Sequence, residues 1–273
     1  MFVTVEKDVH IFVQDVNPGP GSKTVFFVHG WPLNHQMYQY QLNVLPEHGF
    51  RCIAMDIRGN GQSDKPWTGY TYDRLADDIA IVLEALQVEN ATLVGFSVGG
   101  ALSIRYMSRY MSRYNGRRIS KLALIDAVSP SFVKNQESPY GVPKEQADAL
   151  INQMYASLPK FLNDVSLSFF NRNLGAATLE WFSYLGMQSA SYALIKILQA
   201  AANEDVTKDL NKINVPTKIF HGVHDQLIPY KSAELTQQRI KNSQLHALTN
   251  SGHGSPIDQA DELNKELIKF LHA

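Results

Sequence analysis

The sequence predicts an α/β fold, in which a mostly parallel β-sheet carries helices on both faces. Short continuous apolar runs alternate along the chain with longer segments whose apolar residues recur every three or four positions. The short runs are typical of strands that are buried on both faces of a sheet, and the longer spacing is typical of amphipathic helices. Because strands that alternate with helices assemble into parallel sheets, this order predicts the fold class.

The strands can be assigned in order along the chain. A predicted hairpin comes first, in which Phe2–Val5 and His10–Val13 flank a polar turn. The glycine- and proline-rich segment Asn17–Gly21 follows it as a turn, because such residues interrupt regular structure. The remaining predicted strands, of which the last has the weakest pattern, are Thr24–Val28, Cys52–Met55, Ala91–Val94, Leu122–Ile125, Thr217–Phe220 and Gln244–Leu248.

Helices are predicted between and after these strands. Apolar residues lie on one helical face of Asp73–Leu86, and the same spacing recurs from Leu263 to Leu271. Between Ile125 and Thr217 no strand-like run occurs, and we expect a block of helices that forms a lid over the sheet edge. Its predicted helices are Lys144–Tyr155, Leu158–Phe170, Ala177–Met187 and Tyr192–Ala202.

A tandem repeat occupies positions 105–114, where Arg-Tyr-Met-Ser occurs twice and is followed by Arg-Tyr. Four residues advance an α-helix by nearly one full turn. We therefore interpret the repeat as a one-turn extension of the helix that begins near Ala101, and not as a functional ladder of arginines.

The composition excludes several classes of protein. The 25 lysine and arginine residues balance 26 aspartate and glutamate residues, which argues against the broad basic surface of a nucleic-acid-binding protein. A single cysteine, Cys52, excludes a disulfide scaffold and fits a reducing compartment. No signal peptide or membrane-spanning stretch is apparent. We therefore expect a cytoplasmic protein that binds neither nucleic acid nor membrane.

The strongest chemical signal is the pentapeptide 95–99, which reads Gly-Phe-Ser-Val-Gly. It follows a predicted strand and precedes a predicted helix, which is the setting of the nucleophile elbow. The serine of such an elbow sits on a sharp, strained turn, and side chains in place of the flanking glycines would collide with their neighbours. This setting makes Ser97 the candidate nucleophile.

A serine nucleophile needs a base, and the base needs an acid that orients it. His253 is the candidate base, because it stands between glycines directly after the last predicted strand. Asp225 is the candidate acid on the loop after the preceding strand, and Asp126 is its rival. The order Ser97, Asp225, His253 matches the order of a triad on a sheet of this type.

Other polar residues near strand ends receive structural interpretations. His29 precedes the nucleophile and is expected to brace the loop that it begins, and Asp56 is expected to organise the glycine-rich loop 56–64. We expect surface or strand-end positions for His10, His35, His48, His246 and His272. His221 and His224 lie three residues apart on a strand-to-loop segment, a spacing that does not converge on a metal, so no metal site is expected. The G-x-G-x-x-G pattern of a dinucleotide-binding site is not present either, so no such site is expected.

Acyl transfer also requires two hydrogen-bond donors for the oxyanion. One is expected to be the main-chain N–H of Val98, which follows the nucleophile. The other is expected from the loop after Val28, where Trp31 is the candidate through its main chain. Pro32 has no N–H and cannot supply this contact.

Taken together, these segments resemble the α/β-hydrolase family over essentially the whole chain. Within the family they resemble the branch of arylesterases and cofactor-free haloperoxidases, which are also called perhydrolases. The resemblance rests on His29–Leu33, Asp56–Asp64, the elbow at Ser97, His221–Pro229 and Ser251–Gly254. Related dehalogenases and epoxide hydrolases carry aspartate at the elbow, and Ser97 argues against both activities.

The resemblance implies an eight-stranded, mostly parallel sheet with a helical cap inserted between strands 6 and 7. We expect residues 1–128 and 213–273 to form the core and residues 129–212 to form the cap. The resemblance gives Ser97, His253 and Asp225 the roles of nucleophile, base and acid. It also gives Trp31 and Val98 the oxyanion contacts and turns the Trp31 ring towards the acyl pocket.

These assignments predict a serine hydrolase that cleaves small carboxylic esters through an acyl-enzyme, without metal, haem or nucleotide. Pro32 matches the proline that accompanies peracid formation in this branch, so perhydrolysis is an expected side activity. The same triad would also serve a lactonase, a C–C hydrolase, a lyase or a slow ligand sensor, and the sequence does not separate these alternatives. Neither the natural substrate nor the oligomeric state follows from it.

Overall fold

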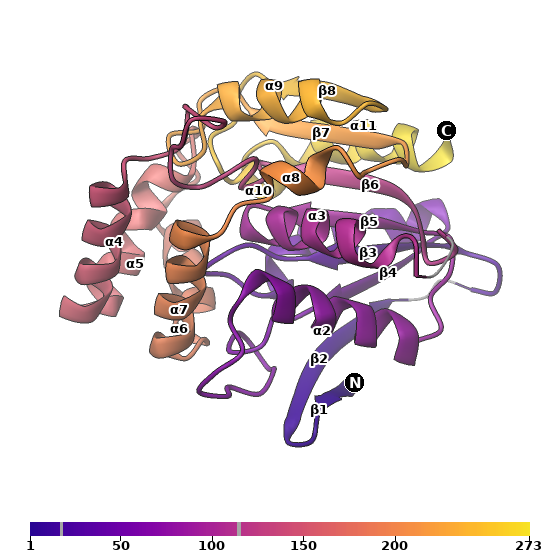
Figure 1. Cartoon of the computed structure of the whole chain (residues 1–273), viewed down its shortest axis with the longest axis horizontal. Coiled ribbons are helices and arrows are strands. Elements are labelled where there is room, and N and C mark those ends of the chain that lie inside the picture. Colours follow the sequence, from indigo (N-terminus) through magenta and orange to yellow (C-terminus); the bar gives the residue numbers. More distant parts are fainter. Residues whose placement is uncertain (17–18, 114–115) are drawn as a thin grey trace.

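The fold is centred on one eight-stranded sheet with the strand order β1-β2-β4-β3-β5-β6-β7-β8 (Figure 1). The structure is a computed structural model that describes residues 1–16, 19–113 and 116–273. β1 and β2 form the predicted antiparallel hairpin, and β2 also pairs antiparallel with β4. The remaining neighbours pair parallel, so the predicted fold class is confirmed.

Each strand coincides with a predicted apolar run and differs from it by a few residues at its ends. The strands are β1 (Phe2–Glu6), β2 (Val9–Val16), β3 (Lys23–Val28), β4 (Phe50–Met55), β5 (Ala91–Phe96), β6 (Ile119–Ile125), β7 (Thr217–Gly222) and β8 (Ser243–Leu248). The central strand β5 is buried along its whole length, as a strand covered on both faces should be. Of the predicted turn, Asn17 and Pro18 lie outside the described residues.

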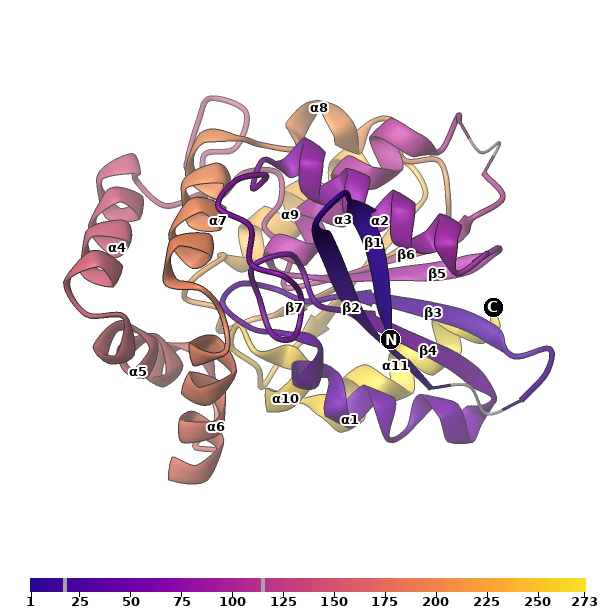
Figure 2. The same ribbon diagram turned by 90° about the horizontal axis from the view of Figure 1, so that it is seen from below.

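Helices cover both faces of the sheet. In Figure 2, α2 and α3 lie on one side of the strands, and α1 and α11 lie on the other. The helices of the core are α1 (Gln39–Leu42), α2 (Tyr72–Ala85), α3 (Val98–Tyr110), α9 (Tyr230–Arg239), α10 (Ser255–Asp258) and α11 (Ala260–His272), with 3-10 turns at His35–Tyr38 and Leu45–His48. Leu263, Leu267 and Leu271 of α11 are buried, as their spacing predicts.

The helical block between β6 and β7 is present where the sequence places it. It contains α4 (Lys144–Ala156), α5 (Leu158–Phe169), α6 (Ala176–Met187), α7 (Ser191–Asn203) and the short α8 (Thr207–Leu210). Figures 1 and 2 both show α4 to α7 grouped beyond one end of the sheet. Ser131 pairs with Asp205 in an isolated antiparallel bridge, which joins the two ends of the insertion. The exact division at residues 129 and 212 stays a prediction.

The tandem repeat lies at the C-terminal end of α3. The helix contains the whole first copy and the first two residues of the second, and it ends at Tyr110; Tyr114 lies outside the described residues. Arg105 bonds to Asp209 of α8 at 2.7 Å and to Asp73 of α2 at 2.5 Å. Arg109 bonds to Asp73 and Asp77. The first two arginines therefore tie α3 to α2 and to the return of the insertion.

Replacing Arg105 with glutamine should lower the free energy of unfolding by about 1–3 kcal/mol, because partly buried carboxylates lose their charged partner. The Arg105 side chain is only 18 % exposed. Arg117→Gln is the matched control, since Arg117 is 72 % exposed and lies 4.0 Å from Glu89. The control should cost less than about 1 kcal/mol. Urea denaturation measures both, and equal losses would contradict the anchoring role of Arg105.

Within the described residues, no helix combines the length and the apolar character needed to cross a lipid bilayer.

Candidate active site

Ser97 occupies the turn between β5 and α3, with a φ of +53° that non-glycine residues rarely adopt. The neighbouring glycines leave no room for side chains. A Cβ at Gly95 would lie 2.5 Å from the Ser103 Oγ, and one at Gly99 would lie 2.3 Å from the Val28 carbonyl oxygen. Side chains at these two positions would collide with neighbouring atoms, as the sequence predicts for the glycines that flank the serine. The turn leaves the serine hydroxyl at the carboxyl end of the central strand.

The three predicted triad residues lie within hydrogen-bond distance of one another. His253 Nε2 is 2.8 Å from Ser97 Oγ, and His253 Nδ1 is 2.7 Å from Asp225 Oδ2. All three side chains are buried. They come from the ends of β5, β7 and β8, which the sheet places at one edge. The chain therefore brings together a hydroxyl, an imidazole and a carboxylate that are 28 and 156 residues apart.

The Asp225 carboxylate is held by three hydrogen bonds and one further ion-pair contact. Its Oδ1 accepts the main-chain N–H groups of Leu227 and Ile228, both at 2.8 Å. Its Oδ2 faces the imidazoles of His253 at 2.7 Å and His221 at 3.3 Å. Burial alone would raise the pKa of Asp225, but these two histidines hold it well below its usual range. Asp225 is therefore ionised and oriented towards His253.

The His253 ring is fixed by aromatic packing and by its own loop. The rings of Phe96 and Phe169 lie 5.2 Å and 4.9 Å from it, centroid to centroid. Asp258 accepts the N–H of Gly252 at 2.8 Å and that of Asn171 at 2.7 Å, which joins the histidine loop to the insertion. Phe169 and Asn171 both belong to the insertion, so the helical block supports the imidazole directly.

The main-chain N–H groups of Trp31 and Val98 meet the requirement for free donors. Val98 is the first residue of α3, where an N–H has no intrahelical partner. Among the described residues, neither N–H donates to a protein acceptor. Both residues line the same cavity as Ser97. The Trp31 indole donates to the carbonyl oxygen of Leu194 in α7 at 3.0 Å, which fixes this loop against the insertion.

His29 braces the loop, as the sequence predicts. Its Nε2 accepts the N–H of Ile57, and its Nδ1 lies 2.9 Å from the carbonyl oxygen of Gly30. Burial lowers the pKa of His29 to about 4, so the ring is neutral and donates from one nitrogen only.

A cavity of about 90 Å³ opens onto Ser97 and His253. Apart from Ser97 and His253, the described residues that line it have apolar side chains or amides. The amides are Gln146 of α4 and Gln226 beside Asp225, and both residues are exposed. The insertion supplies much of the apolar wall, including Leu150, Phe161, Val165, Phe169, Leu198 and Ala201.

Comparison with known proteins decides the family. Residues 23–260 match the family model described as alpha/beta hydrolase fold.

This chain belongs to the α/β-hydrolase family.

Its relatives match it over almost their whole length. The AB hydrolase superfamily protein YisY of Bacillus subtilis is 41 % identical over 100 % of this chain and 99 % of that protein. The bifunctional esterase/perhydrolase DCH of Acinetobacter calcoaceticus is 35 % identical over the same shares. The structure of an esterase from Exiguobacterium antarcticum is 34 % identical, with a TM-score of 0.94 over 100 % of this chain and 99 % of that one. These names agree with the predicted branch.

Asp126, the rival candidate acid of this hydrolase, is not hydrogen-bonded to the candidate base. The Asp126 carboxylate accepts the N–H groups of Gly222 and Ser255, and it forms no hydrogen bond with the His253 ring. The expected position of His35 is wrong, because His35 is buried in a 3-10 turn and bonds to Asp56 at 2.7 Å. Asp56 also accepts the N–H of Gln62, which agrees with its predicted structural role.

A buried cluster beside the triad was missed by the sequence analysis. Ligand atoms of Asp126, His221 and Asp225 lie within 4.8 Å of one another, while His224 is not part of the group. The carboxylate oxygens of the cluster already accept N–H hydrogen bonds, so the chain itself satisfies them. Burial alone would lower the pKa of His221, but Asp225 and Asp126 raise it to about 9. No sequence motif marks such a cluster, since it forms only when β6 and β7 pair.

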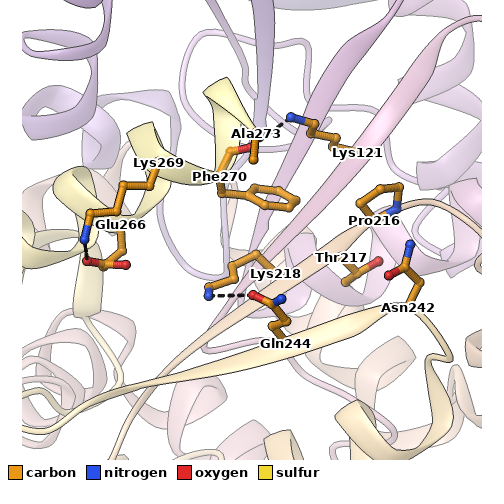
Figure 3. Close-up of a pocket in the computed structure, with 10 residues that line it drawn as sticks. All are labelled: Lys121, Pro216, Thr217, Lys218, Asn242, Gln244, Glu266, Lys269, Phe270 and Ala273. Atoms are coloured by element: carbon orange, nitrogen blue, oxygen red, sulfur yellow. Dashed lines mark hydrogen bonds and ion pairs between the residues drawn. The ribbon is translucent and has the colours of Figure 1, made fainter.

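A larger cavity, of about 430 Å³, lies at the opposite ends of the strands, beside α11 (Figure 3). Its lysines have partners within the chain. Lys121 donates to the carbonyl oxygen of Phe270, and Lys218 donates to the side chain of Gln244. Because this cavity contains no triad residue, size alone does not identify the active site of this hydrolase.

Proposed function

We propose that this hydrolase cleaves small, uncharged carboxylic esters by acyl transfer to Ser97. The hydrogen-bonded chain from Ser97 through His253 to Asp225, at the base of an apolar cavity, carries the proposal. A serine activated in this way is the working part of acyl-transfer enzymes. The similarity to a named esterase/perhydrolase and to a named esterase supports the same reaction class.

The proposed mechanism assigns one step to each contact. Ser97 Oγ attacks the ester carbonyl carbon while His253 Nε2 takes its proton. Asp225 keeps the proton of His253 on Nδ1 and stabilises the imidazolium that forms. The oxyanion accepts the N–H groups of Trp31 and Val98. His253 then protonates the departing alcohol, and an activated water releases the acid from the acyl-enzyme.

The cavity supports a substrate without charge. Among the described residues, no lysine or arginine lines it, so a carboxylate on the substrate would lose its hydration without gaining a cationic partner. Its small volume favours a short acyl chain. We also propose perhydrolysis as a side activity, in which hydrogen peroxide replaces water in deacylation; the named activity of the Acinetobacter relative supports it.

A panel of p-nitrophenyl esters tests this specificity. We expect kcat/KM for the acetate and butyrate to exceed that for the hemisuccinate by at least about 10²-fold, because the hemisuccinate would bury an unpaired charge. The decanoate should also be a poor substrate. A halide-dependent assay with acetate and hydrogen peroxide, run beside the panel, detects perhydrolysis. A preference for the hemisuccinate or for the decanoate would contradict the proposal.

A further inference from the structure

Asp126 connects the two loops that carry the acid and the base. It follows β6 directly and is completely buried. Its Oδ1 accepts the N–H of Gly222 at 2.8 Å, and its Oδ2 accepts the N–H of Ser255 at 3.1 Å. Gly222 stands three residues before Asp225, and Ser255 stands two residues after His253. One carboxylate therefore holds both loops through their backbones.

The loop that carries Asp225 and the loop that carries His253 are in close contact, so there is no room between them for an additional side-chain atom. A Cβ at Gly222 would lie 2.0 Å from the carbonyl oxygen of Gly252. Asp126 is itself held in place, because its N–H donates to the carbonyl oxygen of Phe220 at 2.9 Å and its φ is +44°. The carboxylate is thus a fixed point between β6, the acid loop and the base loop.

We propose that Asp126 is a positioning residue for the proposed triad: its ionised carboxylate sets the separation of the two loops, and this keeps His253 aligned between Asp225 and Ser97. Asp126 does not line the cavity, and the hydrogen bonds of its carboxylate go to Gly222 and Ser255 and not to Ser97. The ionised form is required because both oxygens must accept an N–H. An asparagine, or a protonated carboxyl group, presents a donor to one of the two N–H groups.

The negative charge of Asp126 lowers the stability of the folded protein. A positioning role therefore differs from a purely structural role, because removing the charge should lower activity without lowering stability. Burial raises the pKa of Asp126 from 3.8 to about 6, although the facing groups His221 and His253 lower it; Asp225 and Tyr38 also face it. Between these values the folded protein retains a proton that the unfolded chain has released. The stabilising contribution of this group is therefore lost as the pH rises through that window.

Asp126→Asn should therefore lower kcat without a matching loss of stability. We expect kcat for p-nitrophenyl acetate at pH 8 to fall about 10–100-fold, because small displacements of catalytic groups have effects of this size. KM should stay within about threefold, since the cavity is unchanged. The melting temperature should stay within a few degrees of the wild-type value or rise, because the buried charge is removed.

Asp56→Asn is the matched control. Asp56 is equally buried, and its two oxygens also accept main-chain N–H groups, those of His35 and Gln62. Neither group belongs to the acid or base loop. The control should lower the melting temperature and leave kcat within about threefold. A kcat of Asp126→Asn within twofold of wild type, or equal losses of kcat in both variants, would overturn the proposal.

The pH profile provides a second test that does not depend on the stability of the variant. In the wild type, protonation of Asp126 should lower kcat, so the acid side of the profile should contain a step near pH 6. Asp126→Asn should lack this step. A wild-type profile without a step near pH 6 would overturn the proposal even if the variant fails to fold.

Labelling by a fluorophosphonate separates this proposal from the proposed function, because the probe reports activation of Ser97 without a substrate preference. If the wild type is labelled at Ser97 but hydrolyses no small ester, only the proposed substrate class is wrong. Slower labelling of Asp126→Asn then supports the positioning role, and an unchanged rate contradicts it. Absence of labelling in the wild type would refute the triad and this proposal together.

Discussion

Ser97→Ala is expected to lower kcat for p-nitrophenyl acetate by about 10⁶-fold, because the triad acts as a unit and alanine offers no nucleophile. In the proposed mechanism the Ser97 Oγ attacks the ester carbonyl. This oxygen lies 2.8 Å from His253 Nε2. Substrate binding should change little, since the oxyanion donors and the apolar cavity remain. Fixed-time assays at high enzyme concentration measure the residual rate, and circular dichroism checks that the variant is folded.

Ser232→Ala is the matched control for this change. Ser232 is buried to a similar degree, lies on α9 and lines no part of the cavity. Its kcat should equal that of the wild type. An unchanged rate in Ser97→Ala would rule out Ser97 as the nucleophile, whatever the control shows.

Asp225→Asn should lower kcat by about 10⁴-fold, because an amide does not hold the proton of His253 on Nδ1 and does not stabilise the imidazolium. In the folded protein Asp225 Oδ2 lies 2.7 Å from that nitrogen. Because the pKa of Asp225 lies well below its usual range, the carboxylate is ionised at the pH of the assay. Steady-state kinetics at pH 8 measure the loss.

The comparison of Asp225→Asn with Asp126→Asn separates the two candidate acids. We expect the loss at Asp225 to exceed that at Asp126 by at least about 10²-fold, because only Asp225 contacts the imidazole. A larger loss at Asp126 would identify Asp126 as the acid and contradict the assignment.

The sharp turn that carries Ser97 could be predicted from the sequence because its causes are local. The apolar run before it, the glycines around it and the helix after it specify a strand, a sharp turn and a helix within about twenty residues. The close contacts at Gly95 and Gly99 show why small residues are needed there. Asp225 and His253 then followed from their places after strands, because the carboxyl ends of parallel strands meet at one edge.

The supporting contacts could not be predicted, because they join residues with no shared pattern. Asp126 accepts an N–H 129 positions away, and Trp31 donates to a carbonyl 163 positions away. Such pairs depend on the order of strands in the sheet and on how the insertion packs over it. His35 illustrates the same limit, since its burial depends on Asp56 at the end of β4.

The central claim is that Ser97 becomes covalently acylated, and trapping that intermediate tests it most directly. The enzyme would be incubated with a fluorophosphonate or a slowly hydrolysed ester, digested, and its peptides analysed by mass spectrometry. The account predicts one added group per chain on the peptide that contains Ser97, no such group in Ser97→Ala, and a much slower reaction in His253→Ala. A label on any other residue, or turnover without any covalent adduct, would contradict it.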